Sequence, residues 1–186
     1  METLVSACLG VALSAACGLR IFVPPLVMSV LGRAGYLDLG PGAAWMTTTP
    51  ALVMFGVATA LEVGAYFVPW LDHLLDGIAG PAAVLAGIAV SFAVLHGEDP
   101  VVRWSLALIA GGGAAAAVQT TTTLLRAAST WTTGGLGNPL VSLAELAGAV
   151  VVSVLAVMLP VLAALAIVFF GLAILQLRRR RRRAPA

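Results

Sequence analysis

The chain contains no lysine, and only 10% of its 186 residues are charged. A soluble globular domain has about 25% charged residues, so this sequence has too few to cover a surface that faces water. Hydrophobic residues make up 61% of the chain, and the mean hydropathy is +1.06. We therefore expect lipid to be the solvent over most of the molecule, which has the length of one compact membrane domain.

Motifs of catalytic and metal-binding chemistry are also missing. No cysteine or histidine pair has zinc-site spacing, and there is no Gly-x-Ser-x-Gly elbow. The stretch Thr132–Pro139, TTGGLGNP, lacks the Gly-Lys-Ser/Thr ending of a phosphate-binding loop. Cys8 and Cys17 fall on opposite faces of a helix, where they cannot pair, so we interpret both as small hydrophobic residues. We predict no enzyme, no metal site and no cofactor.

The arginines are distributed unevenly. Six of the ten form one run, Arg178–Arg183, directly after the apolar stretch Val161–Leu177. Arginines that flank a membrane span stay on the cytoplasmic side. We predict a cytoplasmic C-terminal tail, residues 178–186, that contacts anionic lipid headgroups at about 1 kcal/mol per arginine. The other four arginines are outnumbered by eight acidic residues, so no nucleic-acid surface is expected.

The apolar runs predict an all-α, polytopic bundle of about six transmembrane helices, because about 20 apolar residues cross a bilayer as one helix. The runs are Leu4–Leu31, Ala51–Trp70, Pro81–Leu95, Val101–Val118 and Pro139–Leu177. As one helix, the last run would be about 58 Å long, which exceeds a hydrocarbon core about 30 Å thick. We interpret it as two spans hinged near Pro160; without that hinge the chain would have five spans.

Other segments are predicted to interrupt or connect these spans. Pro24-Pro25 predicts that the first helix ends near Gly18, bends, and continues as a short second piece. Gly32–Pro50 is expected to be a loop at headgroup level, and Leu71–Gly80 a short amphipathic segment in the interface. His96–Arg103 is the clearest aqueous loop.

Residues 1–177, predicted to be a single transmembrane domain, divide into halves 1–97 and 101–177 that resemble each other. Each half has a helix of small residues, an arginine, a loop rich in glycine and threonine that ends in proline, and a span with one glutamate. The matched residues are Arg20 with Arg126 and Glu62 with Glu145. Three spans per half would make the second half inverted, which is the architecture of many secondary transporters with broken helices.

We expect the chain to be organised around the polar stretch Gln119–Glu145, which lies between apolar segments. Gly18–Pro25 is a weaker counterpart, and we predict that the two stretches face each other and form a polar centre. The candidate residues for binding a substrate or ion are Arg20, Glu62, Gln119, Thr121, Arg126, Thr132, Thr133, Gly134, Gly135, Asn138 and Glu145.

Each candidate also has a structural interpretation. An ionised carboxylate near mid-bilayer costs at least about 2.5–3.5 kcal/mol. Glu62 therefore couples protons or cations, pairs with Arg20 or Arg126, or is protonated and hydrogen-bonded to a neighbouring helix. Glu145 has a coupling role, lies near an interface, or complements a helix N-terminus. Arg20 binds an anion, pairs with a glutamate, or extends to the headgroups. Thr132–Gly137 is either a substrate-binding broken helix or a surface loop with a helix cap.

Three sequence patterns resemble a family of bacterial integral membrane proteins known only as a domain of unknown function. They are GLR…P in the first helix, PAL…LE…PW.D…D in the second, and ASTWTTGGLGNPLVSLAE. The resemblance extends over nearly the whole chain, and Thr132–Pro139 is its most specific part. It implies a polytopic protein of the inner membrane, without catalytic residues or a substrate.

Three functions remain open. The first is a small transporter or channel-like permease for a small solute, an anion being one candidate, with about six helices and a homodimeric assembly. Glu62 and Glu145 would then couple protons or cations. The second is a flippase or scramblase, in which Arg20 and Arg126 hold a phosphate-bearing headgroup. The third is a non-catalytic membrane assembly partner whose polar residues only pack helices.

Overall fold

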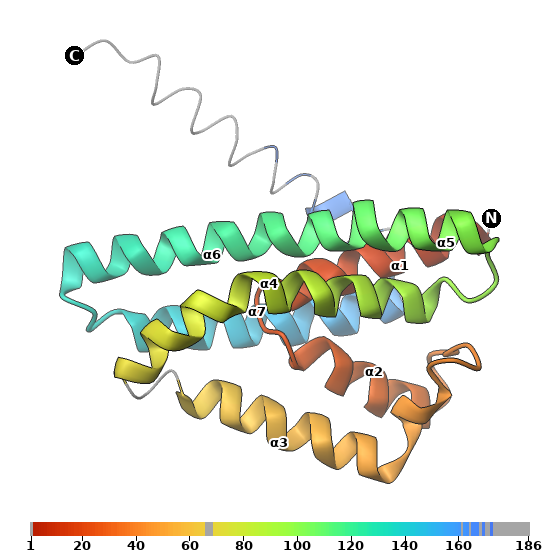
Figure 1. Ribbon diagram of the computed structural model, residues 1–186, viewed down its shortest axis with the longest axis horizontal. Helices are drawn as coiled ribbons and strands as arrows, with labels where there is room; N and C mark the ends of the chain where they lie inside the picture. Colours follow the sequence, from red (N-terminus) through yellow and green to blue (C-terminus); the bar gives the residue numbers. More distant parts are fainter. Residues whose placement is uncertain are drawn as a thin grey trace.

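The structure is a computed structural model that describes the backbone of residues 2–65 and 69–160 and parts of 162–172. Side chains are described over residues 3–65 and 78–160 and the same parts of 162–172. All elements in these residues are helices, which confirms the all-α prediction (Figure 1). In chain order they are α1 (Glu2–Cys17), α2 (Val23–Arg33), the 3-10 helix η1 (Ala44–Thr47), α3 (Thr49–Ala65), α4 (Pro69–Val94), α5 (Pro100–Leu106), the π-helix η2 (Ala107–Gly111), α6 (Gly112–Thr133) and α7 (Asn138–Met158).

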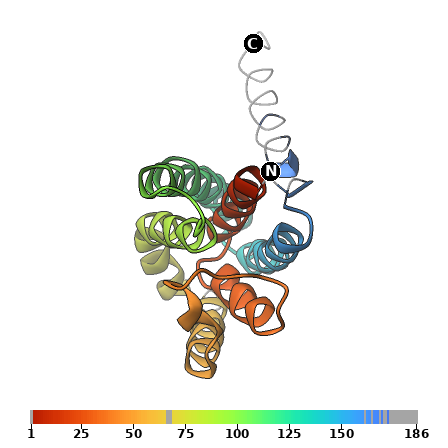
Figure 2. The same ribbon diagram turned by 90° about the vertical axis from the view of Figure 1, so that its right-hand side faces the viewer.

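Helix α1 occupies the middle of the bundle, where it packs against α4, α6, α7 and α2 (Figure 2). Small residues bring these helices together: a Cβ built on Gly18 would lie only 2.5 Å from Ala115 O, and one on Gly87 only 2.7 Å from Ala115 Cβ. Ser14 donates a hydrogen bond to Gly87 O at 2.6 Å. Close approach of this kind is what small residues permit between helices in lipid.

The predicted bend in the first apolar run is confirmed. Helix α1 ends at Cys17, and α2 begins at Val23 with proline in its first turn. Pro24 and Pro25 have no N–H, so a continuous helix would leave the carbonyls four residues earlier without donors. Proline is well tolerated at a helix start, where the N–H would be unpaired in any case. The break therefore leaves Arg20 between two helices.

The prediction for Ala51–Trp70 and Leu71–Gly80 is wrong in part. Helix α3 is described only to Ala65, and Pro69 already begins α4. The segment proposed to lie in the interface is the first part of α4, which continues through Pro81 (Figure 1). A proline inside a helix removes one hydrogen bond and bends the helix, but packing of the remaining turns can hold the two parts together.

The fourth predicted span, Val101–Val118, is shorter than the helix that the structure shows. The chain is helical from Pro100 to Thr133, with a π-helical turn at Ala107–Gly111. The polar stretch from Gln119 is therefore helical as far as Thr133. Threonine hydroxyls make this possible, because a side chain that bonds to its own helix needs no other partner.

The hinge predicted near Pro160 is confirmed. Helix α7 ends at Met158, and Leu159 has a non-helical conformation (φ −142°, ψ 67°). Helical backbone resumes at Pro160, and the amide of Ala163 donates to Leu159 O at 3.0 Å. Cys8 and Cys17 are both free thiols.

Two helices among the described residues are long and apolar enough to cross a membrane, Pro100–Thr133 and Asn138–Met158. Only 22% and 28% of their most apolar windows are buried. The core helix of a soluble protein would be mostly buried, whereas these helices expose large side chains such as Ile109 (77%), Trp131 (89%) and Leu140 (72%). This exposure supports membrane association.

Candidate functional site

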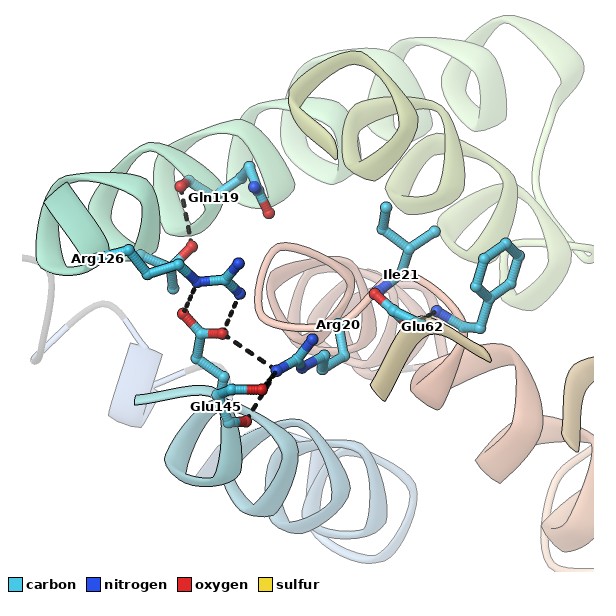
Figure 3. A network of polar contacts seen from close by, with 9 residues as sticks. Arg20, Ile21, Glu62, Gln119, Arg126 and Glu145 are labelled. Carbon is cyan, nitrogen blue, oxygen red and sulfur yellow. Dashed lines mark hydrogen bonds and ion pairs between the residues drawn. The ribbon is translucent and has the colours of Figure 1, made fainter. Parts of the chain in front are cut away.

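The two polar stretches meet inside the bundle, as predicted. Arg20, in the break after α1, donates from Nη2 to the carbonyl oxygen of Ser142 at 2.9 Å and to its hydroxyl. The same Nη2 lies 3.5 Å from Glu145 Oε2. Arg126 on α6 donates from Nε to Glu145 Oε1 at 3.0 Å and from Nη2 to Oε2 (Figure 3). Two guanidinium groups from distant parts of the chain therefore converge on one carboxylate of α7.

This charged centre, which we define as Arg20, Arg126, Glu145 and Ser142, is closed to solvent. Its four residues are between 1% and 5% exposed. Arg126 holds the carboxylate through two parallel bonds, the geometry in which guanidinium–carboxylate pairs are strongest. Removing one partner of a buried ion pair costs about 3–5 kcal/mol, because the other charge is then uncompensated. Because Arg20 is buried in this centre, the alternative in which its side chain extends to the headgroups is wrong.

Glu62, on α3, bonds to the main chain of the break that carries Arg20. Its Oε1 accepts from the amide of Ile21 at 2.8 Å, and its Oε2 from the amide of Phe22 at 3.2 Å (Figure 3). Helix geometry leaves these amides without intrahelical acceptors, and an unpaired amide is costly in a lipid or protein interior. Glu62 also interacts electrostatically with Arg20 and Arg126. It is therefore tied to the main chain directly after Arg20.

Gln119 and Arg126 lie two turns apart on the same buried face of α6 (Figure 3). Thr122, also on this face, donates to Gln119 O at 2.9 Å, and Thr123 donates to the same oxygen at 2.9 Å. Thr121 donates its hydroxyl to Ala117 O at 2.9 Å. These threonines satisfy their hydroxyl donors within α6, so they account for a polar sequence in a continuous helix.

Thr132, Thr133 and Asn138 lie at the helix ends on either side of the turn Gly134–Gly137 between α6 and α7, and none of these residues is part of the centre. Gly134 and Gly135 have positive φ (63° and 89°), which residues with a Cβ rarely adopt. Thr133 Oγ1 accepts from the amide of Gly137 at 2.9 Å, and Asn138 Nδ2 donates to Thr130 Oγ1 at 3.1 Å. Along α6, Thr133 lies about 10 Å beyond Arg126. These contacts agree with the surface-loop interpretation of the motif.

The structure thus brings together Arg20, Arg126 and Glu145 with Glu62 and Gln119 beside them, and separates the turn residues from them. Sequence reasoning missed Ser142. Its signal was present, because it precedes Glu145 by three residues and so lies on the same helix face. Among the described residues, no group of three or more histidine, cysteine, aspartate or glutamate side chains could hold a metal ion.

The sequence matches a family model over residues 7–180, and that family is described as a domain of unknown function (DUF4126). The chain belongs to this family. The matched residues include all four residues of the charged centre and the turn between α6 and α7. No curated protein and no solved structure matches the chain. Functional conclusions therefore depend on the geometry of the centre.

Proposed function

We propose that this protein is a small multi-pass transporter or permease of the bacterial inner membrane, and that it moves a small anionic solute. One observation supports this proposal above all: two buried arginines converge on a single carboxylate inside an apolar helical bundle. Ionisable groups at membrane depth are expensive, and they usually mark pathways for substrates, ions or protons. Two guanidinium groups in a dry site form a strong binding element for an oxyanion.

The proposed topology has six spans. They are the broken pair α1–α2, then α3, α4, the continuous α5–α6, α7, and the chain after Pro160. In this arrangement both termini are cytoplasmic, and the arginine run at 178–183, outside the described residues, contacts anionic lipids. An inverted repeat of three plus three spans would relate Arg20 to Arg126 and Glu62 to Glu145. A homodimer would add helices around a bundle that is small for a transporter.

The break between α1 and α2 favours transport over a purely structural role. A discontinuous helix beside a polar site is a recurring feature of secondary transporters. Here the break places Arg20 in the charged centre, and Glu62 holds the adjacent amides. A bundle whose polar residues only pack helices has no need of an interrupted helix at its most buried arginine.

The test is anion uptake into proteoliposomes that contain the purified protein, with empty liposomes as the background. We expect saturable uptake of a small anion that Arg20→Gln and Arg126→Gln each reduce at least tenfold. Arg33→Gln is the matched control, because Arg33 is exposed at the end of α2 and bonds only to the nearby threonine segment in the described structure. It should retain wild-type uptake.

Two other results would reject the proposal. Scrambling of a fluorescent phospholipid by the reconstituted protein, lost in Arg20→Gln, would assign the arginines to a lipid headgroup. If correctly folded wild-type protein shows neither anion uptake nor lipid scrambling, the function that remains is that of an assembly partner.

A further inference from the structure

The charged centre lies much closer to one end of the bundle than to the other. Helices α5, η2 and α6 form one continuous helix, Pro100–Thr133, whose tryptophans Trp104 and Trp131 are exposed. The two lie about 40 Å apart along the axis, which matches a bilayer with its headgroup regions, and exposed tryptophan prefers the headgroup level. Arg126 is only about 8 Å from Trp131 along this helix. The centre is therefore near the membrane face that carries the α6–α7 turn (Figure 1).

Toward the opposite face, the charged centre is sealed by the close packing of α1, α4 and α6. A Cβ built on Gly18 would lie 2.5 Å from Ala115 O, and one built on Gly111 would lie 2.5 Å from Ser91 Oγ. Ala115 is completely buried, as is Leu13 on α1. Helices that approach this closely leave no room for an anion between them. A solute cannot reach the centre from this side unless the helices separate.

Toward the α6–α7 turn, the centre is covered by a polar layer. Thr130 follows Arg126 by four residues on α6, and Asn138 precedes Ser142 by four residues on α7, so each lies one helical turn nearer the membrane face. Asn138 Nδ2 donates to Thr130 Oγ1 at 3.1 Å and joins the two helices. Both side chains are partly exposed, whereas Arg126 and Ser142 are buried beneath them. We call the pair Thr130 and Asn138 the latch.

The helices that carry the latch are weakly attached to each other. Helices α6 and α7 each pack more extensively on α1 than on one another. A Cβ built on Gly134 or Gly135 would meet no atom within 4 Å in the described structure, so the tip of the turn is not packed against the bundle. Segments with few packed contacts open locally at the lowest cost in free energy. The latch side is therefore where the centre can open most easily.

From this contrast, and on the basis of the transport function proposed above, we propose that the latch is the gate of the charged centre. An anion enters from the face of the α6–α7 turn when Thr130 and Asn138 separate, while the packing of α1, α4 and α6 keeps the opposite side closed. The separated hydroxyl and amide groups offer hydrogen bonds to the entering anion. In the six-span topology this face is cytoplasmic, because two crossings, α7 and the chain after Pro160, separate the turn from the C-terminal tail.

A cysteine in the centre reports the opening. Ser142→Cys changes the size of this buried side chain little, and it is made in full-length protein that also carries Cys8→Ala and Cys17→Ala. A membrane-impermeant methanethiosulfonate reagent is added to membrane vesicles of each orientation, and Leu136→Cys, exposed in the turn, identifies the accessible face. We expect modification of Ser142→Cys only from the face that modifies Leu136→Cys. Ser14→Cys, buried on the sealed side, should stay unmodified from both faces.

Thr130→Val tests the latch itself. Valine keeps the shape of threonine but removes the hydroxyl that accepts from Asn138. Loss of this hydrogen bond should speed the modification of Ser142→Cys about fivefold. Thr120→Val is the matched control, because the Thr120 hydroxyl donates to Ala116 O of its own helix at 2.8 Å. It should leave the rate of modification unchanged.

Two results would overturn the gate. One is modification of Ser142→Cys only from the opposite face or from neither face, and the other is an equal rate in Thr130→Val and Thr120→Val. If Ser142→Cys does not fold, hydrogen exchange of the first turn of α7 replaces it. Thr130→Val should then speed amide exchange over residues 138–142, and exchange equal to that of Thr120→Val would reject the latch.

Anion uptake separates the gate from the transport function. If wild-type protein takes up an anion but Ser142→Cys is modified only from the opposite face, the transporter is retained and the gate is refuted. If Ser142→Cys is modified from the α6–α7 face but the wild-type protein takes up no anion, the opening is retained and the transport function is refuted.

Discussion

At the residue scale, Glu62 has a structural task that is separate from its charge. It lies on α3, and the two amides that it accepts belong to the break between α1 and α2. Helix α3 also packs on the short helix α2 and on the 3-10 helix η1. Glu62 therefore joins a peripheral helix to the segment that positions Arg20.

Glu62→Ala should destabilise the protein markedly. Each buried amide left without an acceptor costs about 1–3 kcal/mol, and this substitution leaves two. Glu62→Gln keeps one acceptor oxygen and should cost less. Thermal unfolding in detergent, monitored by tryptophan fluorescence, measures both, and Glu98→Ala serves as the control in a partly exposed loop. Equal melting temperatures for Glu62→Ala and Glu98→Ala would show that the amides do not depend on Glu62.

At the element scale, glycine and alanine determine how the central helices approach one another. Gly87 on α4 faces Ala115 on α6, and Gly111 in η2 faces Ser91 on α4. The hydroxyls of Ser14 and Ser91 lie 2.9 Å apart and add a polar contact between α1 and α4. Close packing and such hydrogen bonds replace the hydrophobic effect as the source of helix association in lipid.

A pair of helical glycines tests this packing. Gly87→Ala would place a Cβ 2.7 Å from that of Ala115, and overpacking of this kind costs about 1–3 kcal/mol. Gly113→Ala on α6 meets no atom within 4 Å, so it should be neutral or stabilising by about 1 kcal/mol through helix propensity. Melting temperatures in one detergent compare the two. A stabilised Gly87→Ala protein would mean that α4 and α6 are not in close contact there.

The same helices explain why a polar sequence does not interrupt α6. Thr120 and Thr121 donate to carbonyls one turn earlier, at 2.8 and 2.9 Å, and Arg126 is matched by Glu145. Glycine at positive φ then ends the helix at the turn after Thr133. Hydroxyls that bond within the helix and a partner on the next helix are sufficient to keep this segment regular.

At the scale of the whole molecule, the proposed orientation can be tested through the C-terminal arginine run. Fusions of green fluorescent protein and of alkaline phosphatase to the C-terminus should be fluorescent and inactive, respectively, in a bacterial host. The reason is that arginines beside a span are retained in the cytoplasm. Replacement of all six residues of Arg178–Arg183 by glutamine should weaken this bias. An active phosphatase fusion of the unaltered chain would reverse the proposed topology.

Much of this protein follows from its composition and local patterns. Low charge and long apolar runs predicted helices in an apolar solvent, because hydropathy and helical period are properties of neighbouring residues. The Pro24-Pro25 bend and the break before Pro160 were predicted for the same reason, since proline acts on the turn that contains it. The proximity of Arg20 to the Gln119–Glu145 stretch was also predicted, because both segments carry polar residues in a chain that is otherwise apolar.

Only the tertiary structure decided which charges are partners. Arg20 contacts Ser142 across 122 residues, and Arg126 binds Glu145 across 19, so no local pattern could choose between Glu62 and Glu145 for either arginine. The continuity of α4 through Pro81 and of α6 through its threonines was likewise decided by packing and hydrogen bonds that a one-dimensional pattern does not contain. Helices are determined by neighbours in sequence, whereas the polar centre is determined by neighbours in space.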